Sequence, residues 1–129
     1  MTELNARSPK ILVIDDDFAN RRVLQLVLTR NGYTASLAGD GCEGLRMAKA
    51  VRPDLILLDF FMPGEDGFEV LAQLKADPEL RGIPVVIFTV LVREESERQA
   101  LKMGAAAYVT KPFDISEVIT CIRRILPQP

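Results

Sequence analysis

Histidine is absent from the chain, and cysteine occurs only twice in its 129 residues. Without histidine, the chain can neither use an imidazole in catalysis nor carry a phosphohistidine of its own. Cys42 and Cys121 do not form a CxxC pair, so we expect no structural zinc site. Both cysteines are interpreted as small apolar packing residues of a protein in a reducing compartment, with a reactive thiol as the alternative.

Long apolar runs and a large excess of one charge are also missing. The first nine residues lack the apolar core of a signal peptide, and no run approaches the roughly 18 apolar residues of a membrane span. We therefore expect a cytoplasmic protein without membrane contact. The 16 basic and 18 acidic residues leave a net charge of −2, which does not favour nucleic-acid binding. Arg21-Arg22 and Arg123-Arg124 are interpreted as solvated helix faces.

The length and composition indicate a single globular unit. A chain of 129 residues is long enough for one domain with a proper core, and 48% hydrophobic and 26% charged residues are ordinary for this class. No repeat, linker or low-complexity segment is present. We expect residues 1–9 to form a flexible tail, residues 10–127 to form one domain, and no output domain to be attached.

Short apolar runs alternate with amphipathic segments along the chain. Strands are predicted over about residues 10–15, 33–38, 55–58, 83–89 and 105–110. Helices are predicted over about 18–30, 41–51, 68–76, 93–103 and 114–126, and a loop over 64–67. In the first helix, Val23, Leu24, Val27 and Leu28 recur at helical spacing, whereas the 93–103 helix has the thinnest apolar stripe.

Five strands alternating with five helices predict an α/β fold. The expected architecture is a doubly wound, five-stranded parallel sheet with right-handed crossovers and the flavodoxin-like order 2-1-3-4-5. In such sheets, ligands bind beyond the carboxyl ends of the strands, where the strand order reverses. For this order, the switch point lies between the first and third strands.

Acidic residues follow both strands at that point. Asp59 ends the apolar run Leu55–Leu58, and Asp15 and Asp16 end the first strand. Thr89 stands at the end of the fourth strand, and Lys111 follows the fifth. Because the carboxyl ends of parallel strands share one edge of the sheet, we expect these side chains to converge.

Three clustered carboxylates repel one another unless a cation or a proton intervenes. Oxygen ligands favour Mg²⁺, while the absence of a long multi-oxygen loop disfavours Ca²⁺ and the absence of nitrogen and sulfur ligands disfavours Zn²⁺. Lys111 supplies a positive charge and Thr89 a hydroxyl for phosphoryl oxygens. The pattern indicates a phosphoryl-acceptor site in which an aspartate is the nucleophile.

With these motifs in order, residues 10–126 resemble a response-regulator receiver domain of two-component signalling. The motifs are the acidic pair after the first strand, Asp-x-x-Met-Pro followed by Asp-Gly, the threonine, and Lys-Pro-Phe. The resemblance implies that Asp59 is the phosphoacceptor, and that Asp15, Asp16, Asp59 and the backbone carbonyl of Phe61 bind Mg²⁺. Asp17 matches no family role.

The resemblance also implies a mechanism of signalling. Lys111 corresponds to the family's lysine, before a cis bond to Pro112, and Thr89 and Tyr108 to its paired switch residues. The expected donors are a sensor histidine kinase or a histidine phosphotransfer protein, and the output is contact between proteins through the fourth helix, fifth strand and last helix. Such a chain is a monomer or a phosphorylation-dependent dimer, and it is not an enzyme beyond catalysing its own phosphorylation and slow dephosphorylation.

Two other classes are weighed against this interpretation. A small phosphatase with an aspartate nucleophile resembles Asp-x-Asp-x-Thr at that position, but no second acid follows Asp59 in Asp-Phe-Phe-Met-Pro. A structural module that has lost its chemistry is disfavoured by the intact acids, threonine and lysine. Val90 stands where receivers most often carry a small residue, which should hinder the access of bulky donors to Asp59. Phe61 and Leu91, both apolar, resemble the variable pair that flanks the path of the hydrolytic water, with side chains that point to solvent as the alternative. We therefore expect a long-lived phosphoryl group.

Overall fold

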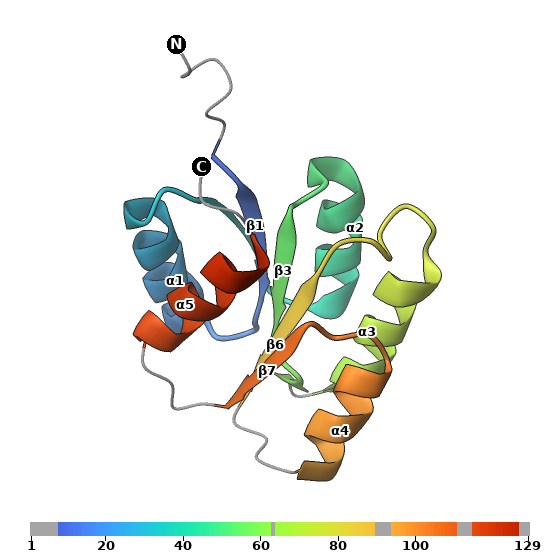
Figure 1. Ribbon diagram of the computed structural model, residues 1–129. Helices are drawn as coiled ribbons and strands as arrows, with labels where there is room; N and C mark the ends of the chain where they lie inside the picture. The colour runs from blue at the N-terminus through green and yellow to red at the C-terminus, as the bar shows by residue number, and fades with distance from the viewer. Residues whose placement is uncertain (1–7, 63, 90–93, 111–114, 127–129) are drawn as a thin grey trace.

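The computed structural model describes residues 8–62, 64–89, 94–110 and 115–126, and its centre is a parallel sheet (Figure 1). The strands of this sheet are β1 (Lys10–Ile14), β2 (Thr34–Ala38), β3 (Leu55–Leu58), β6 (Val85–Thr89) and β7 (Ala107–Thr110). They are all parallel and stand in the order β2-β1-β3-β6-β7. The predicted α/β class and strand order are confirmed.

Helices cover both faces of the sheet. They are α1 (Phe18–Arg30), α2 (Gly41–Val51), α3 (Gly67–Ala76), α4 (Glu94–Lys102) and α5 (Ile115–Ile125). Helices α1 and α5 lie on one face, and α2, α3 and α4 lie on the other (Figure 1). This is the doubly wound arrangement, and it leaves the carboxyl ends of the strands along one edge of the molecule.

The sheet divides the buried apolar side chains into two cores. Alternate residues of each strand point to opposite faces. Leu12, Ile14, Ile56 and Leu58 belong to the core beneath α2, α3 and α4, which we call the α2–α4 core. Ile11, Val13, Leu55 and Leu57 belong to the core beneath α1 and α5, the α1–α5 core. All eight side chains are fully buried, as expected of strands covered on both faces.

Aspartates begin three of the helices. Asp17 caps α1 by accepting hydrogen bonds from the backbone N–H groups of Ala19 and Asn20. Asp40 accepts from the N–H of Glu43 at the start of α2, and Asp66 accepts from Phe68 at the start of α3. Each cap satisfies N–H groups that have no partner inside their own helix. Asp17, which matches no family role, therefore has a structural one.

Local sequence also ends the helices where predicted. Helix α1 stops at Asn31, before Gly32 with its positive φ of 93°. Helix α2 stops at Val51, and Arg52 adopts a left-handed φ of 54° before Pro53, a position where the α-helical conformation is disfavoured. Within α4, Ala100 is the buried residue, which confirms the thin apolar stripe expected there.

Two of the packing predictions are wrong. Val23, assigned to the buried stripe of α1, is 49% exposed, while Leu24 and Leu28 are buried. Cys42, interpreted as a packing residue, is exposed, whereas Cys121 is half-buried against the α1–α5 core. The buried stripe of α1 is thus narrower than its apolar residues suggest.

Among the described residues, no helix has the length and apolar character needed to cross a membrane.

The segment after β3 differs most from the prediction. Instead of a loop, it forms a small antiparallel hairpin of β4 (Phe61–Met62) and β5 (Glu65–Asp66). Strands of two residues are too short to show an alternating pattern, so the sequence carries no strand signal there. Helix α3 also begins at Gly67, which was assigned to the loop. Residues 61–62 are therefore paired with residues 65–66 shortly after Asp59.

Candidate functional site

Backbone hydrogen bonds of the sheet position two of the three candidate acids. The N–H of Asp15 donates to the carbonyl of Ala38 at 3.1 Å, and the N–H of Asp59 donates to the carbonyl of Ile14 at 3.0 Å. These bonds continue the ladders that join β1 to β2 and to β3. The two acids therefore stand on adjacent parallel strands at the point where each strand ends.

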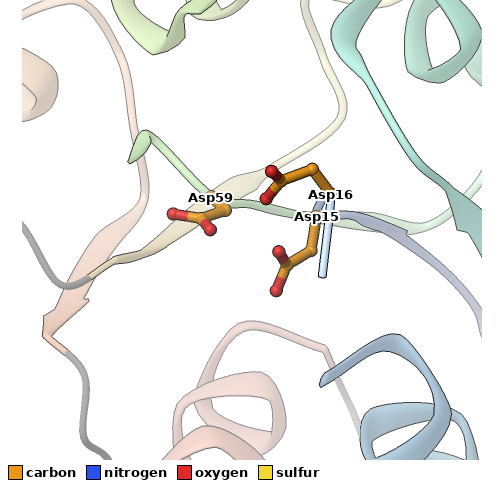
Figure 2. Close-up of side chains that lie close together, drawn as sticks. All are labelled: Asp15, Asp16 and Asp59. Atoms are coloured by element: carbon orange, nitrogen blue, oxygen red, sulfur yellow. The ribbon is translucent and has the colours of Figure 1, made fainter. Parts of the chain in front are cut away.

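The three carboxylates form one cluster. Oxygen atoms of Asp15, Asp16 and Asp59 all lie within 4.8 Å of one another. Asp15 is fully buried, Asp59 is 3% exposed and Asp16 is exposed. Figure 2 shows Asp15 and Asp16 leaving the end of β1 and Asp59 leaving the end of β3, with their carboxylates gathered at the same edge. The predicted convergence of these acids is found in the structure.

The start of α1 holds the side chain of Asp15 in place. One carboxylate oxygen accepts from the N–H of Asp17 at 3.0 Å, and the other accepts from the side-chain amide of Asn20 at 3.3 Å. The guanidinium of Arg21 donates to the backbone carbonyl of Asp15 at 2.7 Å. Arg21 is thus part of the site's support, which corrects its interpretation as a residue of a solvated face.

Thr89 and Tyr108 lie on the two strands beyond β3. Thr89 is fully buried at the end of β6. Tyr108 pairs with Ile87, so Thr89 lies two residues further along the neighbouring strand and on the same face. The ring of Tyr108 meets that of Phe60 edge-on, with centroids 6.2 Å apart. Burial raises the pKa of Tyr108, and the charges of Glu97 and Asp59 raise it further.

The remaining predicted residues are divided between described and undescribed parts of the chain. Phe61 lies in β4, so its backbone belongs to the hairpin two residues after Asp59. Lys111 and the following Pro112 lie outside the described residues, as do Val90 and Leu91. The ammonium group of Lys111 and the cis bond to Pro112, both expected after β7, therefore stay predictions.

The acid cluster fits a hard divalent cation. Two buried carboxylates and one exposed carboxylate present only oxygen ligands within a space of a few ångströms. Mutual repulsion of buried carboxylates is costly, and a cation between them removes that cost. Exposed Asp16 leaves one side open to water, as suits Mg²⁺, which keeps several water ligands.

A contact of the hairpin that follows Asp59 also gave no signal in the sequence. Glu65 of β5 accepts hydrogen bonds from the N–H of Gly41, the first residue of α2, at 2.9 and 3.0 Å to its two oxygens. The partners are 24 residues apart, so no local motif joins them. Their pairing could be found only after the hairpin had been placed beside α2.

Known proteins share both the sequence pattern and the fold. The response regulator receiver domain family matches residues 11–123. The response regulator PleD of Caulobacter vibrioides is 49% identical over 107 residues, which cover 83% of this chain and 24% of PleD. Sporulation initiation phosphotransferase F of Bacillus subtilis is 36% identical over 118 residues, covering 92% of this chain and 94% of that protein. The chain thus spans about a quarter of one relative and nearly all of the other.

Solved structures agree with this assignment. The chemotaxis protein CheY4 of Vibrio cholerae has a TM-score of 0.86 and 28% identity, with 92% of this chain and 99% of CheY4 covered. The receiver domain of Francisella response regulator 1452 has a TM-score of 0.84 and 33% identity, covering 92% of this chain and 96% of that one. With acids in place at the ends of β1 and β3, this chain belongs to the response regulator receiver domain family.

Proposed function

We propose that Asp59 accepts a phosphoryl group from a phosphohistidine of a sensor histidine kinase or a histidine phosphotransfer protein. The observation that carries the proposal is the cluster of Asp59 with Asp15 and Asp16 at the strand-order switch point. One carboxylate oxygen of Asp59 forms a bond to phosphorus as the donor's phosphorus–nitrogen bond breaks. The electron pair of that bond stays on the imidazole, which then takes up a proton.

The other residues hold and neutralise the reacting groups. Asp15, Asp16 and Asp59, with the backbone carbonyl of Phe61, would hold Mg²⁺, which when bound offsets negative charge on the transferring group. The hydrogen bonds to Asp15 keep its carboxylate oriented before the cation arrives. From the family pattern, the hydroxyl of Thr89 donates to a phosphoryl oxygen.

Lys111 and the surface of the molecule complete the proposal. In the family pattern, the ammonium group of Lys111 contacts another phosphoryl oxygen, and Thr89 and Tyr108 move inward after phosphorylation. The surface of α4, β7 and α5 then changes and binds a downstream protein. The chain acts on no separate substrate, works as a monomer or a phosphorylation-dependent dimer, and belongs in the cytoplasm, where its two free cysteines stay reduced.

Phosphorylation in vitro tests the acceptor. The protein is incubated with a small acyl phosphate, with and without Mg²⁺, and the modified residue is located by mass spectrometry. We expect a Mg²⁺-dependent label on Asp59 that is lost in Asp59→Asn. Asp54→Asn is the matched control, because Asp54 precedes β3 at the opposite edge of the sheet, where it accepts a hydrogen bond from the N–H of Lys10. Equal labelling of Asp59→Asn, or no label on the wild type, would refute the proposal.

A second experiment tests the coupling of the site to the output surface. Beryllofluoride with Mg²⁺ mimics an aspartyl phosphate, and NMR spectra record which backbone amides respond. We expect chemical shift changes in β6, β7 and α4, beyond the residues next to Asp59. Changes confined to the segment around Asp59 would show that the acceptor is not coupled to this surface.

A further inference from the structure

The hairpin of β4 and β5 follows β3 in the chain but is hydrogen-bonded to the start of α2. Glu65 pairs with Met62 across the hairpin, and Phe61 pairs with Asp66. The half-buried carboxylate of Glu65 then crosses to α2, where both its oxygens accept from the N–H of Gly41. A carboxylate at the first residue of a helix also interacts favourably with the helix dipole.

The first turns of α2 are themselves packed against the acid-bearing strand. A Cβ atom on Gly44 would lie 2.5 Å from the Cδ1 of Ile14, so only a glycine allows α2 to approach that closely. Ile14 is the last residue of β1 and immediately precedes Asp15 and Asp16. The first turns of α2 are therefore held against the end of β1.

These contacts connect the ends of the two strands that carry the acids. The chain passes from Asp59 at the end of β3 through Phe61 into the hairpin. Glu65 of the hairpin is hydrogen-bonded to Gly41 of α2, and α2 packs against Ile14 at the end of β1. The hairpin is also anchored by Met62, which is buried in the α2–α4 core, and by its connection to β3. The contact between Glu65 and Gly41 adds a direct bond from the hairpin to the start of α2. A tether at the far side of the hairpin restricts its motion toward or away from the acids.

We propose that Glu65 is a positioning residue for the metal centre. By fixing the hairpin to α2, its carboxylate sets the place of the Phe61 carbonyl relative to Asp15 and Asp16. The inference rests on the proposed function, since it is that function which assigns the Phe61 carbonyl to Mg²⁺. Glu65 acts through the backbone of the hairpin and does not itself contact the cation.

The expected effect follows from the number of steps between Glu65 and the cation. Removing a group that directly orients a metal ligand typically costs about 10–100-fold in affinity. Because Glu65 acts one step further out, we expect Glu65→Ala to weaken Mg²⁺ binding about three- to tenfold. Glu65→Gln keeps one oxygen that can accept from Gly41, so its loss should be smaller.

Two control variants separate positioning from charge and from helix stability. Glu69 lines the same shallow groove of about 380 Å³ as Glu65, between α2, the hairpin and α3, so Glu69→Gln removes a nearby charge without cutting the tether. Asp40 caps α2 through the N–H of Glu43, so Asp40→Ala weakens the same helix end and leaves the hairpin bond intact. Both controls should bind Mg²⁺ more tightly than Glu65→Ala.

The test is a calorimetric titration of each variant with Mg²⁺ alone, at a temperature well below its unfolding midpoint. NMR supplies the second measurement, because the carbonyl carbon of Phe61 should shift on adding Mg²⁺ to the wild type and shift less in Glu65→Ala. Equal affinity of Glu65→Ala and the wild type would overturn the inference, as would an equal loss in Asp40→Ala or Glu69→Gln. If the wild type itself bound no Mg²⁺, the proposed function would fail, and with it the basis of the inference.

Discussion

Replacing Gly67 with alanine should disturb the contact between α3 and the residue next to the phosphoacceptor. Gly67 is the first residue of α3, and a Cβ atom there would lie 2.5 Å from the Cδ1 of Phe60 and 2.7 Å from its Cα. The ring of Phe60 could turn away, but the Cα belongs to the backbone that follows Asp59. The added methyl group must therefore displace the helix or the chain beside the acid cluster.

The magnitude is a balance of two opposing effects. Alanine in a helix is more favourable than glycine by about 0.8–1 kcal/mol, and less at a helix end. Inserting a methyl group into a packed contact costs about 1–3 kcal/mol, and the backbone atom here places this case in the upper part of that range. We expect Gly67→Ala to lower the free energy of unfolding by about 1–2 kcal/mol.

Gly82 supplies the matched control for this prediction. A Cβ atom on Gly82 would meet nothing within 4 Å, so Gly82→Ala should be neutral or stabilise the protein by about 0.4–1 kcal/mol. The chain has no tryptophan, so urea unfolding is best followed by far-ultraviolet circular dichroism. Gly67→Ala as stable as the wild type would refute the argument, because α3 would then have moved aside at no cost.

Three further predictions concern the tyrosines and the lifetime of the phosphoryl group. The hydroxyl of Tyr33 is buried without a hydrogen-bond partner among the described residues, so Tyr33→Phe should keep or raise the unfolding free energy, by up to about 1 kcal/mol, and a clear loss in urea unfolding would contradict this. In that variant Tyr108 is the only tyrosine. Burial and the charge of Glu97 raise the pKa of Tyr108 in the folded protein. The unfolded chain therefore loses this proton first, and the free energy of unfolding should fall as the pH rises from about 10 through the folded-state pKa. Glu97→Gln should lower the pKa of Tyr108 in an absorbance titration, and an unchanged pKa would refute the role of Glu97. From the sequence pattern, Phe61→Asn or Leu91→Glu should speed loss of the phosphoryl group about tenfold, and unchanged or slower decay in both would end the case for shielding.

The sequence was sufficient to predict the sheet and the acid cluster. Continuous apolar runs such as Leu55–Leu58 identify strands covered on both faces, and the alternation of strands with helices limits the topology to a few choices. Once the strand order is known, Asp15 and Asp59 must come together, because both follow strands that are neighbours in a parallel sheet. Those inferences need only local pattern and general rules of topology.

The supporting contacts could not be predicted in the same way. Asn20 and Arg21 reach Asp15 because α1 starts at a particular rotation, and a polar residue on a helix face does not reveal that rotation. The wrong prediction for Val23 also comes from the unknown rotation of α1. Val23 lies one residue, or about 100° around the helix, from buried Leu24, and so at the edge of the apolar stripe. Glu65 depends on a hairpin too short to leave a periodic pattern.

The division of the interior by the sheet has a consequence for how mutations combine. Leu74 belongs to the α2–α4 core and Leu28 to the α1–α5 core, and both are fully buried. Truncating either to alanine should cost about 2–5 kcal/mol. The losses in unfolding free energy at distant sites with no shared partner usually add within about 0.3–0.5 kcal/mol. A double-mutant cycle between Leu28 and Leu74 therefore measures the energetic coupling between the two cores across the sheet. A coupling energy above that range would mean that the strands carry strain from one face of the domain to the other.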